Sequence, residues 1–422
     1  MAKRRYSTVK CKQVDWAVWA EAIGGKRAVF AVDVAKEKFV ASLQVAGGRT
    51  LVRVSWSHPR ETLALLSGLE VWAQAASTLV VVMESSGVYG DALRWQLQQR
   101  GIDVHRVSAK RVHDSAEVYD GVPSLHDAKA TELIGKLYWE GLSAPWPIVS
   151  EARREQLVHL RRLEQAKARV QRERNRLEAL LARHWPELPD LLSLGSASLL
   201  RLVATYGGPA PLSLLRGGAR KLLHEVGGRL LTQEKIEAVL ASAECTLGMP
   251  CTPGEREQLR WQAEQVIEAQ REKRQAERRL VREHTPEDNL QPMRERLGQV
   301  TSAVLLATQG DPRSYPSAAS YCKGIGLNLK EHSSGKHRGQ LTLTKRGPAL
   351  ARFYLYFAAL RLIARDPVIK RWYALKTARP GAVKMKQVIE LMRKLAKAFW
   401  HQANGHDFDV ERLVNLKALT DA

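Results

Sequence analysis

The feature that most constrains the fold is a pair of short apolar runs, each of which carries a carboxylate near its end. Residues 28–34 are apolar except for Asp33, and the β-branched run 78–83 is followed directly by Glu84. Runs of this length predict buried strands, and the second is typical of a central strand covered on both faces. A buried carboxylate must be paired, protonated or bound to a metal. Although a single Asp in a strand is more often salt-bridged or exposed to solvent, two acids on two such strands point to a site.

The pattern around these runs predicts an α/β domain. We expect strands at 28–34, 38–45 and 50–56, with a turn at Gly47-Gly48 before the third. A helix over 58–74, the strand 78–83, a helix over 89–100, a strand at 102–107 and a helix over 127–140 follow. Three strands followed by alternating helices and strands is the element order of an RNase H-like fold.

Three acids fall where such a fold would hold a site. Asp33 lies on the first strand, Glu84 at the tip of the fourth, and Asp127 at the start of the last helix. Strand ends of mixed sheets are where sites gather, and converging carboxylates repel one another unless a cation lies between them. Mg²⁺ suits these hard oxygen ligands, and two such ions can clamp a phosphodiester. We therefore predict a divalent metal site at these three residues.

The charge of the chain predicts a polyanionic partner. The 422 residues carry a net charge of +22, and the excess of Lys and Arg is largest in the last third. Nucleic acid is favoured over a membrane, since the longest apolar stretch, 353–364, contains Arg361 and is too short to span a bilayer. The four scattered cysteines form no CxxC pair, which favours a reduced cytosolic protein over a disulfide framework or zinc site.

The middle of the chain predicts long charged helices. From residue 150 leucines recur at helical spacing while arginines crowd the polar side, and a second charged helix is expected over about 253–282. The two helices could pack antiparallel. The arginine-rich face is either a solvated surface or a dimerising surface that also contacts nucleic-acid phosphates.

Two motifs resemble those of the DEDD-type insertion-sequence transposases, which are related to the Piv-type invertases. They are Phe-Ala-Val-Asp-Val-Ala-Lys at 30–36 and Glu-Ser-Ser-Gly-Val-Tyr at 84–89. The third motif of that family contains two aspartates and is matched around Asp127. In one register the second aspartate falls on Ala130, and in the other Ser124 takes the place of the first. Asp120 and Glu132 are the nearest substitutes, but Glu132 turns away from Asp127 on a helix.

The resemblance continues near the C-terminus, at Glu-His-Ser-Ser-Gly-Lys (331–336) and Leu-Thr-Lys-Arg-Gly (343–347). It implies that the DNA-cleaving nucleophile is Ser333 or Ser334. From the residues alone the segment is an ordinary basic turn, although a serine nucleophile does need positively charged surroundings. The candidate nucleic-acid contacts are Lys336, Arg338, Lys345, Arg346, Lys384 and Lys386.

The resemblance implies a DNA transposase or site-specific recombinase that cuts and rejoins insertion-element and target DNA. It implies an acidic site that binds Mg²⁺, a serine from another protomer that forms a phosphoserine link, a structured bridge RNA as guide, and a homo-oligomer from dimer to tetramer. It also implies a bacterial cytoplasmic, nucleoid-associated protein.

We expect five segments along the chain: a basic arm (1–27), a RuvC/RNase H-like domain (28–147), a helical coiled-coil linker (148–285), a mainly α transposase domain (286–405) and a tail (406–422). Two alternative functions stay open. One is a metal-dependent nuclease of the Holliday-junction type, and the other is a degenerate nucleic-acid-binding protein, which Ala130 would favour.

Overall fold

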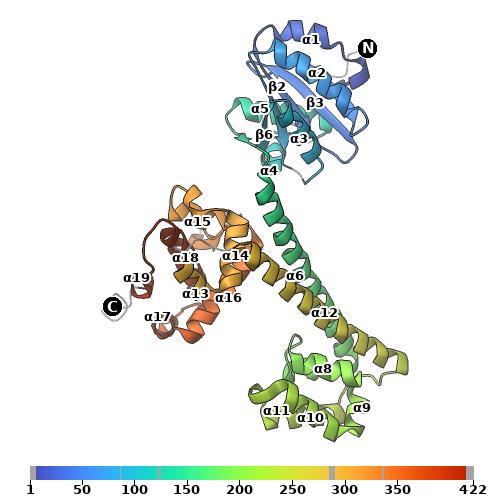
Figure 1. Cartoon of the computed structure of the whole chain (residues 1–422), viewed down its shortest axis with the longest axis vertical. Coiled ribbons are helices and arrows are strands. Elements are labelled where there is room, and N and C mark those ends of the chain that lie inside the picture. The colour runs from blue at the N-terminus through green and yellow to red at the C-terminus, as the bar shows by residue number, and fades with distance from the viewer. Residues whose placement is uncertain are drawn as a thin grey trace. The chain divides into compact units, whose positions relative to one another are not determined.

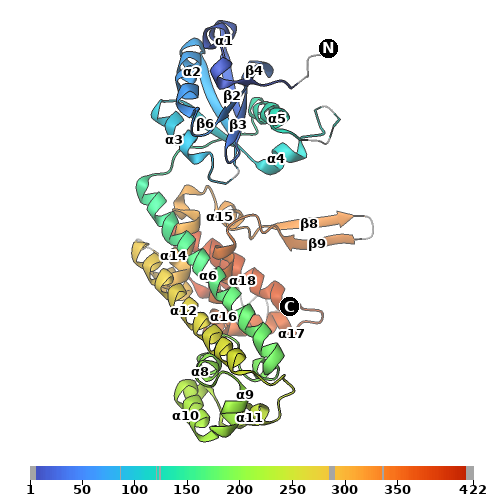
Figure 2. The same cartoon turned by 90° about the vertical axis from the view of Figure 1, so that its right-hand side faces the viewer.

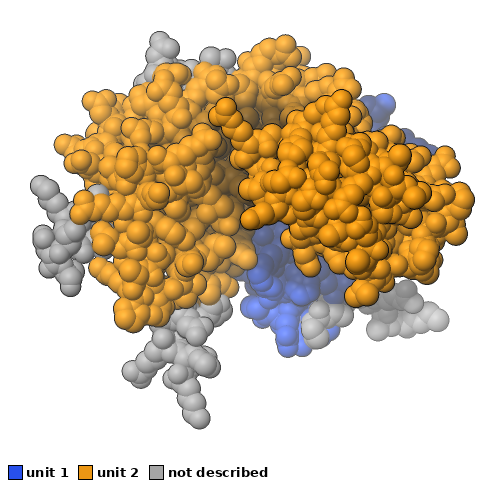
Figure 3. Space-filling model, turned by 90° about the horizontal axis from the view of Figure 1, so that it is seen from below, with its two compact units in different colours: residues 1–150 blue, residues 151–422 orange. Residues whose placement is uncertain are grey.

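The computed structural model divides into two compact units, residues 1–150 and 151–422 (Figures 1 and 3). It describes the backbone of residues 6–85, 87–119, 121–122, 125–284, 290–334 and 337–414, and the side chains of all of these except 332–340. The first unit is a mixed α/β domain and the second is mostly helical, as the sequence predicts. The finer boundaries expected within the second unit stay predictions.

A seven-stranded sheet forms the centre of unit 1, in the order β1-β4-β3-β2-β5-β6-β7. The strands are β1 Val9–Lys10, β2 Arg27–Asp33, β3 Lys38–Val45, β4 Arg49–Ser57, β5 Thr78–Glu84, β6 Asp103–Val107 and β7 Ala144–Pro145. β2, β3 and β4 pair antiparallel, whereas β5 runs parallel to β2, and β6 runs parallel to β5. Gly47 and Gly48 both have positive φ angles and make the predicted turn between β3 and β4. The short edge strands β1 and β7 were not expected.

Helices cover both faces of this sheet. They are α1 Trp16–Ile23, α2 Thr62–Ala75, α3 Asp91–Gln99, α4 Ala109–Asp114 and α5 Asp127–Trp139. One apolar cluster joins alternate residues of β2 and β5 to α1, α2 and α3, and the other joins the intervening residues to α4 and α5. The burial of both faces explains why 78–83 is apolar without alternation. The element order expected of an RNase H-like fold is therefore present.

Unit 2 begins with a pair of long helices, α6 Glu151–His184 and α12 Pro253–Glu283. Arg169 of α6 contacts Glu272 of α12, whereas Arg183, further along α6, pairs with Glu255 at the start of α12. The two helices are therefore antiparallel, as predicted (Figure 1). Their coiled-coil character stays a prediction.

Short helices lie between the two long ones in the chain and pack on them. They are α7 Leu188–Leu191, α8 Ala197–Tyr206, α9 Pro209–Leu214, α10 Arg216–Gly227 and α11 Gln233–Glu244. Their apolar residues share one core with the adjoining ends of α6 and α12, where Trp185 is fully buried.

The last part of unit 2 is a second helical core from which a ribbon of two strands extends (Figure 2). The helices are α13 Gln291–Leu297, α14 Gln299–Gln309, α15 Ala318–Gly324, α16 Ala349–Arg365, α17 Pro367–Ala378, α18 Lys384–Ala403 and α19 Val410–Val414, and the ribbon consists of β8 Leu329–Ser334 and β9 His337–Leu343. The ribbon was not predicted from the sequence. Among the described residues no helix is long and apolar enough to cross a membrane.

Candidate active site

Strand pairing places two of the three predicted acids at the same end of the sheet. β2 and β5 are parallel neighbours, and Val32 lies opposite Met83. Asp33 and Glu84 are the next residues of these strands, and adjacent strands are about 4.8 Å apart. Asp127 is the first residue of α5, which packs against the same strands through the second apolar cluster.

The electrostatics of Asp33 show that the charges of both other acids reach it. Burial is the largest cause, followed by the nearby charges of Asp127 and Glu84, and together they raise the pKa of Asp33 to about 6. A hydrogen bond with the backbone of Val34 acts in the opposite direction. The structure thus brings together acids that are almost a hundred residues apart in the chain.

The chemistry of these acids suits a divalent cation, because they are hard oxygen donors whose mutual repulsion a cation would relieve. The three carboxylates lie further apart than the ligands of one bound metal ion would. Within the described part of the chain, no three His, Cys, Asp or Glu side chains are close enough to hold one ion together. The donor types therefore fit a metal, and a bound ion would have to draw the carboxylates closer.

Position 130 does not contribute to the acidic group. Ala130 is only 4% exposed and packs in the apolar cluster between α5 and the sheet. Glu132 forms an ion pair with Arg53 of β4, which agrees with the prediction that it turns away from Asp127. The other two positions considered, Ser124 and Asp120, lie outside the described residues.

The start of α5 is held by residues that the sequence pattern did not single out. His126 caps the helix, and its Nδ1 accepts a hydrogen bond from the backbone N–H of Lys129 at 3.3 Å. The buried Lys129 donates from Nζ to the carbonyl of Val122 at 2.6 Å. The ring of Tyr6 packs edge-on against His126 with centroids 4.7 Å apart. These contacts fix the helix end that carries Asp127. His126 and Lys129 could have been noticed by their closeness to that acid in the sequence, whereas Tyr6 gave no such signal.

The two candidate serines lie at the end of the ribbon. Ser333 and Ser334 are the last residues of β8, and Ser334 pairs with His337 at the start of β9. Lys336 lies outside the described residues, and the side chains of Ser333, Ser334 and Arg338 are likewise outside them. The backbone thus places the serine motif at the point where the ribbon reverses.

The base of the ribbon is pinned to the helical core. Thr344 bonds to Asn328 across the ribbon through both backbone and side chain, at 3.0 Å for the backbone pair. Arg352 of α16 donates to the carbonyls of Ile325 and Gly347 at 3.0 and 2.8 Å. A Cβ on Gly347 would lie 2.4 Å from the carbonyl oxygen of Gly324. The absence of a side chain at Gly347 therefore allows the close crossing of chains that anchors the ribbon.

A groove of about 980 Å³ lies between the ribbon base and α18. Two of the candidate nucleic-acid contacts, Lys345 and Lys386, line it together with Arg393, Lys394 and Lys397. Its carboxylate, Glu390, pairs with Lys376. Burial lowers the pKa of Lys394, and the charge of Glu390 acts in the opposite direction. Arg346 and Lys384 are exposed and do not line this groove.

Comparison with known protein families matches the segment with the acids and the segment with the ribbon to related transposase families. Residues 30–186 match the IS110-type DEDD family described as "Transposase", and residues 295–374 match the "Transposase IS116/IS110/IS902 family". The first match contains Asp33, Glu84 and Asp127, and the second contains the ribbon. Over these two stretches the chain is similar to transposases of the IS110 family.

A curated relative agrees with this assignment. The "Insertion element IS110 uncharacterized 43.6 kDa protein" of Streptomyces coelicolor is 26% identical to the chain over 239 residues. The alignment covers 54% of the chain and 57% of that relative, so a little over half of each sequence is compared.

Proposed function

We propose that the chain is a DNA transposase that cuts and rejoins element and target DNA. The observation that carries this proposal is the group of three carboxylates at one end of the sheet, where Asp127 and Glu84 help to raise the pKa of Asp33 to about 6. Acids from three separate chain segments gathered in this way support a functional role over a structural one. Their position inside the first family match supports the same conclusion.

In this proposal the acids and a serine have separate roles. Asp33, Glu84 and Asp127 hold a divalent cation, with Mg²⁺ as the natural candidate for carboxylate ligands. The bound cation would neutralise charge on a phosphate and its leaving oxygen. The hydroxyl of Ser333 or Ser334 loses its proton and forms an ester with the phosphate while the sugar oxygen departs as a hydroxyl. The bond energy stays in that ester, so the DNA can be rejoined without ATP.

The partners follow from the charge and from the family. The excess of 66 Lys and Arg over 44 Asp and Glu supports binding to DNA and to a structured guide RNA. A serine from one protomer acting at the acids of another would require a homo-oligomer, from a dimer to a tetramer. The +22 charge by itself does not distinguish the two nucleic acids.

The test is a covalent trap with DNA that carries the ends of the element. We expect the native chain to form a protein–DNA adduct that survives denaturing electrophoresis, and one of Ser333→Ala and Ser334→Ala to abolish it. Ser314→Ala is the matched control, because Ser314 is an exposed serine in the same family match. Asp33→Asn should remove the adduct while leaving DNA binding in place.

Two results would contradict the proposed function. If Ser333→Ala combined with Ser334→Ala cleaves DNA at the native rate and no adduct forms, water is the nucleophile and the chain is a metal-dependent nuclease. If no variant or native sample cleaves DNA in Mg²⁺, the chain only binds nucleic acid.

A further inference from the structure

A large basic groove lies in unit 2, on the helix pair, and its lining includes none of the three acids and neither serine. It has a volume of about 1250 Å³ and is bounded by α6, α12, the loop before α8, and α16. The space-filling view shows unit 2 hollowed between its two masses (Figure 3). The lining of the groove contains no Asp or Glu. It contains six Lys and Arg residues, which are Lys167, Arg172, Arg174, Arg176, Lys273 and Arg274.

Not all of these cations are neutralised by neighbouring acids. Arg172 and Arg176 pair with Glu173, and the remaining ion pair joins Lys273 to Glu277. Arg174 and Arg274 have no carboxylate within ion-pair distance among the described residues. A surface that gathers unpaired guanidinium groups is unfavourable by itself, and an anion in the groove would offset their repulsion.

Arg174 is held in place but incompletely satisfied. Its guanidinium lies against Gly195, where a Cβ would be 3.3 Å from the central carbon. Its Nε is buried and has no hydrogen-bond partner in the described part of the chain. A buried donor without a partner is costly, and such groups often mark the place of an absent ligand.

The loop before α8 adds a second donor surface. Ser193, Gly195 and Ser196 line the groove, and Ser196 caps α8 by accepting a hydrogen bond from the backbone N–H of Leu199 at 3.3 Å. Gln270 of α12 donates to the carbonyl of Gly195 at 3.0 Å, which fixes the loop on the helix pair. The positive end of α8 therefore faces the same space as Arg174, and this arrangement favours phosphate groups.

Two aromatic side chains of α16 also line the groove. Phe353 lies beneath Lys167, whose Nζ is 4.0 Å from the ring centroid, whereas Phe357 is 49% exposed. An exposed ring beside a line of cations can stack on a base that is not already paired, which a duplex does not offer. The volume also exceeds the roughly 300–1,000 Å³ of ordinary small-molecule sites.

We propose that this groove binds an unpaired stretch of a nucleic-acid chain, with its phosphates on Arg174 and Arg274 and a base on Phe357. The inference rests on the proposed function only in taking nucleic acid as the partner, and it does not depend on cleavage. DNA and RNA share the phosphates and bases that it invokes, so the test compares both.

The experiment measures binding of fluorescein-labelled 15-nucleotide oligo(dT) and oligo(U) to the full chain by fluorescence anisotropy at several salt concentrations. Arg174→Gln combined with Arg274→Gln should weaken binding at least tenfold and reduce the slope of log K against log salt by about 1.4, since each lost single-strand phosphate contact removes about 0.7. The matched control is Arg201→Gln combined with Arg229→Gln, two exposed arginines of the same unit outside the groove.

A second variant tests the stacking separately. Phe357→Ala should weaken binding of the single strands about tenfold and leave binding of a 15-base-pair duplex unchanged. Whichever of oligo(dT) and oligo(U) shows the larger dependence on the groove is its partner.

Two results would overturn the proposal: groove variants that bind both single strands like the native chain, or equal losses for the duplex and the single strands. Asp33→Asn serves to separate this inference from the proposed function. It should abolish cleavage and leave oligonucleotide binding intact, whereas a native chain that never cleaves DNA would refute the proposed function alone.

Discussion

The raised pKa of Asp33 makes the stability of unit 1 depend on pH in a defined direction. The folded chain binds the proton of Asp33 more tightly than the unfolded chain, since the pKa rises from 3.8 to about 6. The stabilisation from this proton is complete below pH 4 and is lost as the pH rises through about 6. The full shift corresponds to about 3 kcal/mol, and solvent at this partly exposed side chain reduces the expected effect to about 1–2 kcal/mol.

Asp33→Asn removes the titrating group and keeps its size. We expect the variant and the native chain to have similar free energies of unfolding at pH 4, and the variant to be about 1–2 kcal/mol more stable at pH 7. The assay is urea denaturation in EDTA followed by tryptophan fluorescence, which senses unit 1 because Trp56 and Trp72 pack beside Phe30 of β2. Comparing the two proteins at each pH cancels the titration of groups that do not interact with Asp33.

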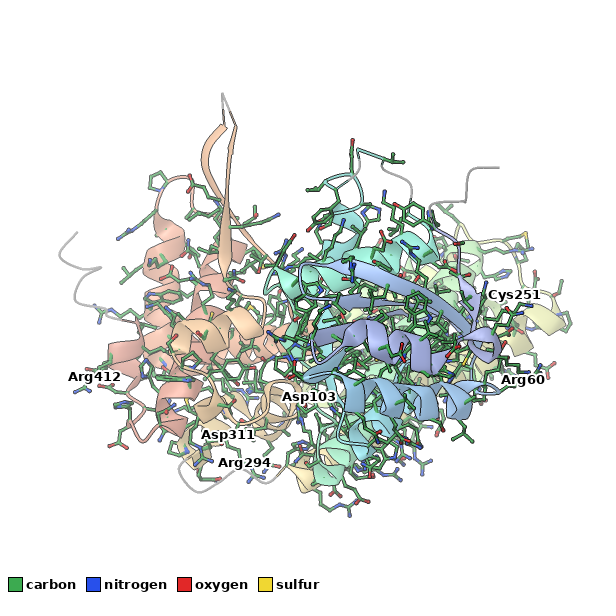
Figure 4. The ribbon with its side chains drawn as sticks, turned by 90° about the horizontal axis from the view of Figure 1, so that it is seen from above. Arg60, Asp103, Cys251, Arg294, Asp311 and Arg412 are labelled. Atoms are coloured by element: carbon green, nitrogen blue, oxygen red, sulfur yellow. The ribbon has the colours of Figure 1, made fainter. Side chains whose placement is uncertain are left out.

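The control is Asp103→Asn, at the start of β6 (labelled in Figure 4). Asp103 pairs with Val80 in the sheet, whereas Glu84 pairs with Val107, so the control lies toward the opposite end of β6. Because Asp103 is not among the charges that act on Asp33, this variant should keep the loss of stability that the native chain shows as the pH rises through about 6. Parallel curves for native and Asp33→Asn would refute the coupling of the three acids, and so would a variant that is less stable at pH 7.

Three further predictions concern packing and charge. Glu132→Gln should lower the free energy of unfolding by about 1–3 kcal/mol, since it leaves the mostly buried Arg53 without its carboxylate, and urea denaturation measures this loss. Gly68→Ala should cost about 1–3 kcal/mol in the same assay, because the new Cβ would lie 2.3 Å from the ring of Trp16, whereas Gly25→Ala has space and tests only the backbone. Binding to duplex DNA should weaken about a thousandfold or more between 50 and 200 mM salt if six or more phosphates are contacted, and a flat titration would contradict the electrostatic footprint.

The sheet and the position of its acids could be predicted because both depend on local pattern. An apolar run covered on two faces has no alternation, and the order of such runs defines the element order. Asp33 and Glu84 end adjacent parallel strands, so their closeness follows from the topology. The structure agrees through their electrostatic coupling, while their catalytic and metal-binding roles stay predictions.

The ribbon was not predicted from the sequence because its strands do not cover an apolar core. Its strands, Leu-Lys-Glu-His-Ser-Ser and His-Arg-Gly-Gln-Leu-Thr-Leu, show little apolar alternation since the ribbon extends away from the helices (Figures 2 and 4). The basic groove was not predicted from the sequence for a different reason. Its walls come from residues as far apart in the chain as Lys167 and Phe357, and only the folding of α16 against the helix pair brings them together.

The three acids and the candidate serines belong to different compact units, and this division bears on how the proposed activity would be controlled. The acids belong to a sheet that is complete within residues 1–150, and the serines stand on a ribbon anchored within residues 151–422. Neither fold needs the other for its core, so each can be stable while the pair is not assembled. In the proposed mechanism, cleavage requires the acids and the serine at one phosphate, and the binding of nucleic acid can bring them together. In the proposed enzyme the substrate therefore completes the active site, and stray cleavage by the unbound protein should be rare.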